Sequence, residues 1–251
     1  MDITNINSLE ALLDCWKEKH FSDGKIRFIY DGCANSSKYM SCNKKVMLIL
    51  KEGYFDESDC ILEERANKPW VKYFKRDGNN WIYRFDENLG NEKPWYMWCR
   101  VESLVRPIIS KITGGNIAKP LEYISVVNLK KSKDQAGGGE PDNSNVWSND
   151  KRVEEYAIED RDLLIKQIEL LDPDIVICGG TYSMCMNANI LGNVKSKVYD
   201  FEPKQLRSLW LHEIELASKK KNVQVIDMYH PSVPMKYDVM GELIAGAIIE
   251  Q

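Results

Sequence analysis

Four short apolar runs stand out along the chain, and each is rich in β-branched residues. Because such runs are typical of strands buried on both faces, we predict strands at 46–50, 123–129, 175–178 and 223–228. Stretches with helical spacing of apolar residues separate these runs. This alternation is typical of βαβ units, so we expect an α/β fold with three layers (αβα) around a short, mainly parallel, four-stranded central sheet.

Apolar residues at helical spacing predict most of the elements between the strands. Helices are expected over 8–20, 60–77, 94–113, 149–171, 205–218 and 236–250, and another should start near Thr181. Pro107 should kink or divide the helix over 94–113, because proline lacks the backbone N–H that a helix needs. The other expectations are a short strand over 26–30, a turn over 31–37, and a hairpin or edge segment over 193–201.

The chain has 251 residues, a length that suits one domain. We therefore predict a single domain over 1–251. Within it, residues 1–45 would form a helical or extended N-terminal extension, and residues 60–115 a helical insertion rich in tryptophan. No internal repeat and no low-complexity tail divides the chain further.

Charge and composition narrow the classes of function. The chain has 34 Lys and Arg against 38 Asp and Glu, a formal net charge of −4, which argues against a protein that coats nucleic acid through bulk charge. A single basic face remains compatible with this balance. No run of 18 apolar residues occurs, so no membrane span is expected, and the acidic, helical start does not resemble a signal peptide. These features predict a cytoplasmic protein.

The seven cysteines include no CxxC pair. In a cytoplasmic protein we expect them to be reduced thiols, and their spacing does not favour zinc or iron–sulfur ligation. We therefore predict no metal site.

Ligands of parallel α/β sheets bind beyond the carboxyl ends of the strands, and polar residues follow each predicted strand. Glycines follow the third strand, at 179 and 180. The candidate site residues at the other three strands are Glu52, Gly53, Tyr54 and Phe55, then Asn128, Lys130 and Lys131, and finally His230 and Ser232.

Three of these residues could carry chemistry, and each also has a structural alternative. His230 could donate a hydrogen bond to a developing oxyanion, or it could only cap the turn before Pro231. Glu52 could orient or deprotonate a water molecule, or it could form an ion pair with Lys51 or Lys130. Asn128 could pair with the edge of a base, or it could satisfy the backbone of a neighbouring loop.

The remaining candidates would bind rather than react. Gly53 could let the backbone approach a ligand, or it could be a turn glycine. Tyr54 or Phe55 could stack on a base, although an aromatic residue after a strand can equally belong to the core. Lys130 and Lys131 could hold phosphates, or they could belong to a solvated surface cluster.

The segments LILKEGY, VVNLKK, DIVICGGT and YHPSVP, in this order, resemble motifs of the uracil-DNA glycosylase superfamily, over about 46–239. The resemblance implies that superfamily's fold and a DNA glycosylase that hydrolyses the N-glycosidic bond of an extruded base, with uracil as a candidate. It implies DNA or a nucleotide as partner, with no metal and no organic cofactor. The implied roles are catalysis by Glu52 and His230, base binding by Gly53, Tyr54, Phe55 and Asn128, and phosphate or DNA contacts by Lys130, Lys131 and Ser232.

Two other hypotheses stay open. Lys51 occupies the first position of the water-activating motif and the proline of that motif is absent, so a non-catalytic module could bind a nucleotide or nucleic acid in the same pocket. A doubly wound domain outside this superfamily is the third hypothesis. The absence of GxGxxG and GxxxxGK[ST] motifs from the sequence weakens its common cofactor-binding versions.

Overall fold

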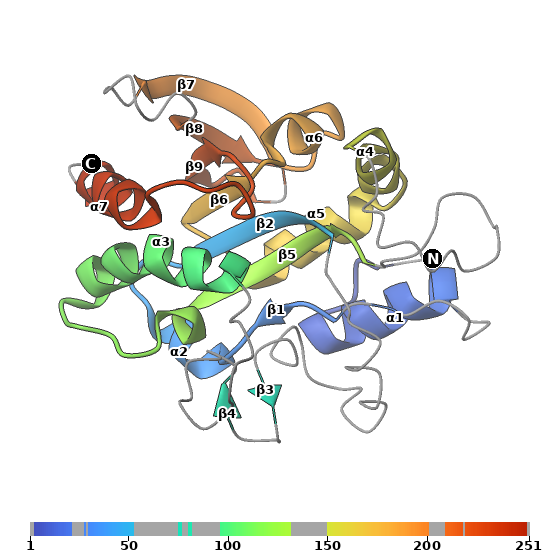
Figure 1. Cartoon of the computed structure of the whole chain (residues 1–251). Coiled ribbons are helices and arrows are strands. Elements are labelled where there is room, and N and C mark those ends of the chain that lie inside the picture. Colours follow the sequence, from blue (N-terminus) through green and yellow to red (C-terminus); the bar gives the residue numbers. More distant parts are fainter. Residues whose placement is uncertain are drawn as a thin grey trace.

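The computed structural model describes residues 3–21, 28, 30–52, 75–76, 80–81, 96–131, 150–200, 209–217 and 219–249. The strands of its main sheet are β1 (Gly32–Cys33), β2 (Val46–Glu52), β5 (Ile124–Lys130), β6 (Ile175–Gly179), β7 (Gly192–Asp200), β8 (Trp210–Leu216) and β9 (Asn222–Met228). They form one seven-stranded sheet in the order β1–β5–β2–β6–β9–β8–β7 (Figure 1). A separate two-stranded sheet pairs β3 (Lys75–Arg76) with β4 (Asn80–Trp81).

All four predicted strands are present, and they lie side by side. β5, β2, β6 and β9 are neighbours and run parallel, which confirms the α/β class. The predicted short, four-stranded sheet is wrong, because three further strands extend it with antiparallel pairing. β1 adds to the β5 edge, while β8 and β7 add to the β9 edge as a hairpin.

The helix predicted over 205–218 is wrong, since β8 occupies 210–216. Leu211 of this strand packs into the core on one face of the sheet, and Ile214 packs into the core on the other. Apolar residues on both faces remove the simple alternation that identifies a half-buried strand. The edge segment predicted over 193–201 is confirmed as β7, which pairs with β8 along its length.

The helices agree with prediction in part. They are α1 (Leu9–Phe21), α2 (Ser36–Ser41), α3 (Tyr96–Thr113), the short 3-10 helix η4 (Pro120–Tyr123), α4 (Asp150–Glu159), α5 (Arg161–Leu171), α6 (Tyr182–Asn187) and α7 (Tyr237–Ile249). Pro107 lies inside α3 without dividing it. The turn predicted over 31–37 is wrong, because β1 and the start of α2 fall there. None of the described helices is both long and apolar enough to cross a membrane.

The single helix predicted over 149–171 is two helices, α4 and α5, separated at Asp160. The buried carboxylate of Asp160 accepts hydrogen bonds from Trp16 Nε1 and Lys19 Nζ, both at 2.9 Å. The contacts to α1 thus hold the chain at the point where the helix is interrupted. The helix predicted over 60–77 lies mostly outside the described residues, but 75–76 belong to β3 instead.

Helices cover both faces of the sheet. α1, α4, α5 and α6 share a hydrophobic core with one face, and α3 and α7 share a second core with the other (Figure 1). The backbones of α3 and α7 approach closely at Gly241, where a Cβ atom would lie only 2.2 Å from the carbonyl oxygen of Leu104.

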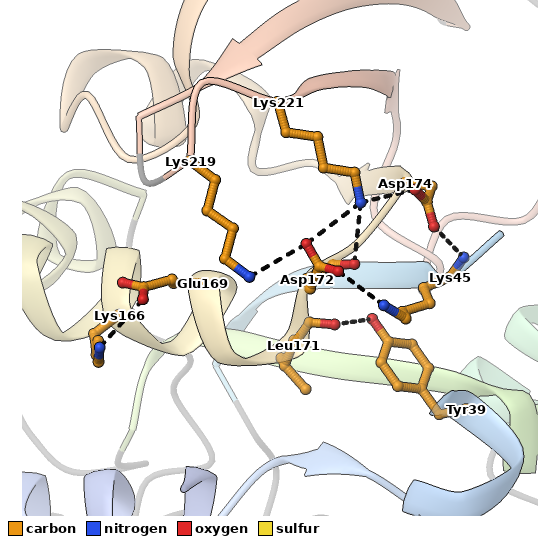
Figure 2. A network of polar contacts seen from close by, with 9 residues as sticks. All are labelled: Tyr39, Lys45, Lys166, Glu169, Leu171, Asp172, Asp174, Lys219 and Lys221. Atoms are coloured by element: carbon orange, nitrogen blue, oxygen red, sulfur yellow. Dashed lines mark hydrogen bonds and ion pairs between the residues drawn. The ribbon is translucent and has the colours of Figure 1, made fainter. Parts of the chain in front are cut away.

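An ion-pair network joins the segments that precede three strands, at the amino ends of the parallel sheet (Figure 2). Asp172 ends α5 in the left-handed conformation (φ 49°) and pairs with Lys45, Lys219 and Lys221. Asp174 pairs with Lys221 Nζ at 2.7 Å and accepts a hydrogen bond from the backbone N–H of Lys45. The network ties the starts of β2, β6 and β9 together, at the edge opposite the candidate site.

Candidate functional site at the carboxyl edge of the sheet

The carboxyl ends of the four parallel strands meet at one edge of the sheet. Glu52 is the last residue of β2 and lies opposite Lys130, the last residue of β5. Gly179 ends β6, and His230 follows two residues after the end of β9. The topology therefore brings the ends of all four predicted strands to a common edge, with the turn after β6 between the ends of β2 and β9.

The glycine turn after β6 packs directly against the His230 loop. The backbone N–H of Gly180 (φ +68°) donates to the carbonyl oxygen of Met228 at 2.7 Å. A Cβ atom at Gly180 would lie 3.1 Å from the backbone nitrogen of His230, and one at Gly179 would lie 3.0 Å from Pro231 Cδ. At Gly180 the backbone of His230 occupies the space of a side chain and φ is positive, whereas at Gly179 that space is taken by the side chains of Leu50 and Pro231.

The imidazole of His230 is held in one tautomer. The backbone N–H of Ser232 donates to Nδ1 at 3.2 Å, and Ser232 Oγ lies 2.8 Å from the same atom. Since Nδ1 accepts, the neutral ring carries its proton on Nε2. Burial, assisted by the charge of Lys51, lowers the pKa of His230 to about 4, while Asp150 acts in the opposite direction. At neutral pH the ring is therefore uncharged, with an N–H donor at Nε2.

Two helices fix the backbone of the His230 loop. Arg100 of α3 donates to the carbonyl oxygens of Pro231, at 3.2 Å, and of Ser232. The hydroxyl of Tyr237, at the start of α7, donates to the carbonyl oxygen of Val233 at 2.6 Å. Arg100 and Tyr237 were not predicted as site residues, because both act on backbone carbonyls and no local sequence pattern marks them.

Glu52 and Lys130 form a buried ion pair. Lys130 Nζ lies 3.2 Å from Glu52 Oε2, and the two side chains are 0% and 4% exposed. The same ammonium lies 5.3 Å from the ring centre of Tyr156 on α4. The structure thus shows the ion pair that the sequence left as the alternative for Glu52, and Lys130 is not part of a solvated surface. A role of Glu52 toward water stays a prediction.

Asn128 and Lys131 belong to a second buried cluster, centred on Asp31. The Asp31 carboxylate accepts from the backbone N–H of Asn128 at 2.6 Å and from its side-chain amide at 3.2 Å. It also accepts from Lys131 Nζ at 2.6 and 2.7 Å and from Gln167 Nε2 at 2.6 Å. Because Asp31 and Lys131 are buried, this placement does not support a phosphate contact by Lys131.

The described site residues therefore form separate clusters along one edge. His230 and Ser232 lie together, Glu52 pairs with Lys130, and Asn128 is tied to Asp31. Gly53, Tyr54 and Phe55 lie outside the described residues. Asp31 and Gln167 were not predicted as part of the site, because they lie 136 positions apart and share no local sequence signal.

Three further polar side chains, Tyr182 of α6, His212 of β8 and Asp227 of β9, lie on neighbouring elements of this part of the sheet. The ring of Tyr182 stacks on that of His212, with centroids 4.5 Å apart and planes at 10°. Asp227 lies opposite Cys178 on β6 and Trp210 on β8, and burial raises its pKa to about 6. Its carboxyl group is thus protonated more readily than an exposed one.

Within the part of the chain that the structure describes, no three His, Cys, Asp or Glu side chains gather in a way that could hold a metal ion. No family model matches the sequence, and no curated protein matches it either. Function therefore has to be inferred from the geometry of this edge.

Proposed function

We propose that the chain hydrolyses the N-glycosidic bond of a nucleobase extruded from DNA, held at the carboxyl edge of β5, β2, β6 and β9. The observation that carries this proposal is His230, a neutral imidazole whose Nδ1 accepts from Ser232 and whose Nε2–H is the donor. A fixed neutral donor stabilises negative charge that develops on a leaving base, in the manner of an oxyanion hole. The imidazole keeps its Nε2 proton throughout, so it acts as a hydrogen-bond donor and not as an acid.

The resemblance of four segments to the uracil-DNA glycosylase superfamily supports the same proposal. In our interpretation, β5, β2, β6 and β9 are the core of a uracil-DNA glycosylase-like fold, and β1, β7 and β8 are additions. In their described residues, three of the segments that carry the resemblance include the carboxyl ends of β2, β5 and β6, and the fourth begins directly after β9. The bases that such an enzyme would accept, uracil among them, belong to the test below.

The proposed reaction breaks the bond between the base and the sugar carbon and forms a bond from the water oxygen to that carbon. One proton of the water is released to solvent, and the departed base takes up a proton from solvent. His230 would donate through Nε2 to the departing base, which leaves as an anion. Glu52 would orient the water molecule, while Lys130 holds its carboxylate through Oε2. Extrusion of the base from the stack would precede the chemistry.

An excision assay tests the proposal directly. Single-stranded oligonucleotides that carry uracil and a panel of other altered bases would be incubated with the wild type, His230→Ala and Glu52→Ala. His212→Ala is the matched control, since it removes a histidine from the middle of β8. Loss of a charge-stabilising donor predicts excision roughly 100- to 1,000-fold slower for His230→Ala, and a nearly unchanged rate for the control. Equal excision by wild type and His230→Ala would refute the assignment.

A non-catalytic binding module is the second candidate, and the buried Glu52–Lys130 pair favours it. Glu52 Oε2 already contacts Lys130 Nζ at 3.2 Å, so this oxygen is occupied and less available to a water molecule. In that case the wild type would bind oligonucleotides with a strong salt dependence but would release no base from any member of the panel.

A further inference from the structure

Lys51 and Asp150 form an ion pair near His230 that the proposed chemistry does not use. Lys51 is the penultimate residue of β2, and Asp150 is the first residue of α4, 99 positions later. Lys51 Nζ lies 2.5 Å from Asp150 Oδ1, and the side chains are 26% and 69% exposed. The charges of both residues act on the His230 ring, in opposite directions.

This ion pair is suited to exchange. Since the Asp150 carboxylate is mostly exposed, water screens its attraction to Lys51, and such pairs contribute little. Asp150 also begins α4, so the free N–H groups of the first helical turn favour its charge even without Lys51. Lys51, by contrast, is mostly covered and carries an ammonium that suits phosphate oxygens. An incoming anion can therefore replace Asp150 at little cost.

We propose that Lys51 binds a phosphate of the nucleic-acid strand next to the base held by His230, and that Asp150 occupies Lys51 until the strand arrives. This inference rests on the proposed function and adds to it a positioning residue. It assigns the phosphate to Lys51 rather than to Lys131, whose ammonium is buried on Asp31. Asp150 then acts as an internal competitor of the substrate.

Binding measurements on two variants and one control test this assignment. The probe is a single-stranded oligonucleotide with an uncleavable abasic-site analogue, and its affinity is measured over a series of salt concentrations. The variants are Lys51→Gln and Asp150→Asn. The control is Glu155→Gln, which removes a carboxylate of the same helix that pairs with Arg152 at 3.1 Å instead.

Lys51→Gln should bind the probe roughly 10-fold more weakly, because a charge-assisted hydrogen bond is lost. The magnitude of the slope of log affinity against log salt concentration should fall by about one, the value expected for one phosphate contact. Asp150→Asn should bind roughly two- to fivefold more tightly, because the competitor is gone. Glu155→Gln should change neither. Inhibition by the free base should be the same in all four proteins, since the base contacts His230 and not Lys51.

The opposite effects of the two variants separate binding from a structural role. If Asp150→Asn weakens binding as Lys51→Gln does, the ion pair is structural and the inference is wrong. If the wild type excises a base but neither variant changes binding, the inference fails alone and the proposed function stands. If the wild type neither binds nor excises, the proposed function fails and this inference fails with it. A histidine titration by NMR checks the geometry, because Lys51→Gln should raise the pKa of His230 and Asp150→Asn should lower it.

Discussion

Replacing Asp31 with alanine should destabilise the fold more than any exposed charge deletion. The Asp31 carboxylate is fully buried and accepts hydrogen bonds from Asn128, Lys131 and Gln167. Its loss would leave the buried ammonium of Lys131 without the carboxylate that it contacts, and only the charge of Asp160 would still act on it. Burial already lowers the pKa of Lys131, while the charge and hydrogen bonds of Asp31 act to raise it.

Breaking a buried ion pair from one side costs about 3–5 kcal/mol. The amide donors of Asn128 and Gln167 lose their acceptor as well, so we expect the free energy of unfolding to fall by at least about 3 kcal/mol in Asp31→Ala. Lys131→Met is the matched variant. It breaks the same pair from the other side but should cost less than Asp31→Ala, because the remaining carboxylate keeps its three amide contacts.

The stability of Asp31→Ala should also depend on pH in a way that distinguishes it from the wild type. Without Asp31, the pKa of Lys131 in the folded state falls further below its value in the unfolded chain. Between these two values the unfolded chain binds more protons, so the stability of Asp31→Ala rises as the pH increases from 7 toward 10. Urea denaturation followed by tryptophan fluorescence would measure the effect at several pH values. A loss below about 1 kcal/mol with no dependence on pH would refute the reasoning.

Three further predictions concern Gly241, Asp172 and Asp227. Gly241→Ala should lower the free energy of unfolding by about 3 kcal/mol or more, because its Cβ would lie 2.2 Å from the carbonyl oxygen of Leu104. Gly246→Ala, on the same helix, meets no atom within 4 Å and should raise that free energy by about 0.5–1 kcal/mol. Thermal melts in which the two variants behave alike would contradict this. Burial acts to raise the pKa of Asp172, but the nearby lysines lower it overall, so Asp172→Asn should lower the free energy of unfolding by about 1 kcal/mol at pH 7. This loss of stability should shrink as the pH falls below 4, and also in high salt. A loss that grows in acid would refute the prediction. Burial raises the pKa of Asp227 to about 6, so this residue disfavours the folded state once it is ionised. Asp227→Asn should therefore raise the free energy of unfolding by about 1 kcal/mol at pH 8 and hardly at all at pH 4. Equal gains at both pH values would count against burial as the cause.

The parallel core of the sheet was predictable because each of its strands is apolar on both faces. Val46 to Leu50 and Ile175 to Cys178 are continuous apolar runs, and a run of that length fits no amphipathic helix. The antiparallel strands were not predictable in the same way. Gly32–Cys33 reads as a turn, and it becomes a strand only because the edge of β5 offers backbone partners.

The candidate site shows the same division between local and distant signals. His230 and Ser232 were found because their contact spans two positions and belongs to a short motif. Asp31 escaped notice because its partners Lys131 and Gln167 lie 100 and 136 positions away and look like surface residues in the sequence. Contacts at such separations depend on the packing of α5 and β5, which no local pattern encodes.

The state of the His230 ring is the central claim, and NMR of protein labelled with ¹⁵N-histidine measures it directly. The chain has three histidines, and the ring signals that disappear in His230→Gln identify those of His230. We expect His230 to have an unprotonated Nδ1 and a protonated Nε2, and its ring to stay neutral until the pH approaches about 4. A His230 ring that is protonated at pH 6, or that carries its proton on Nδ1, would contradict it.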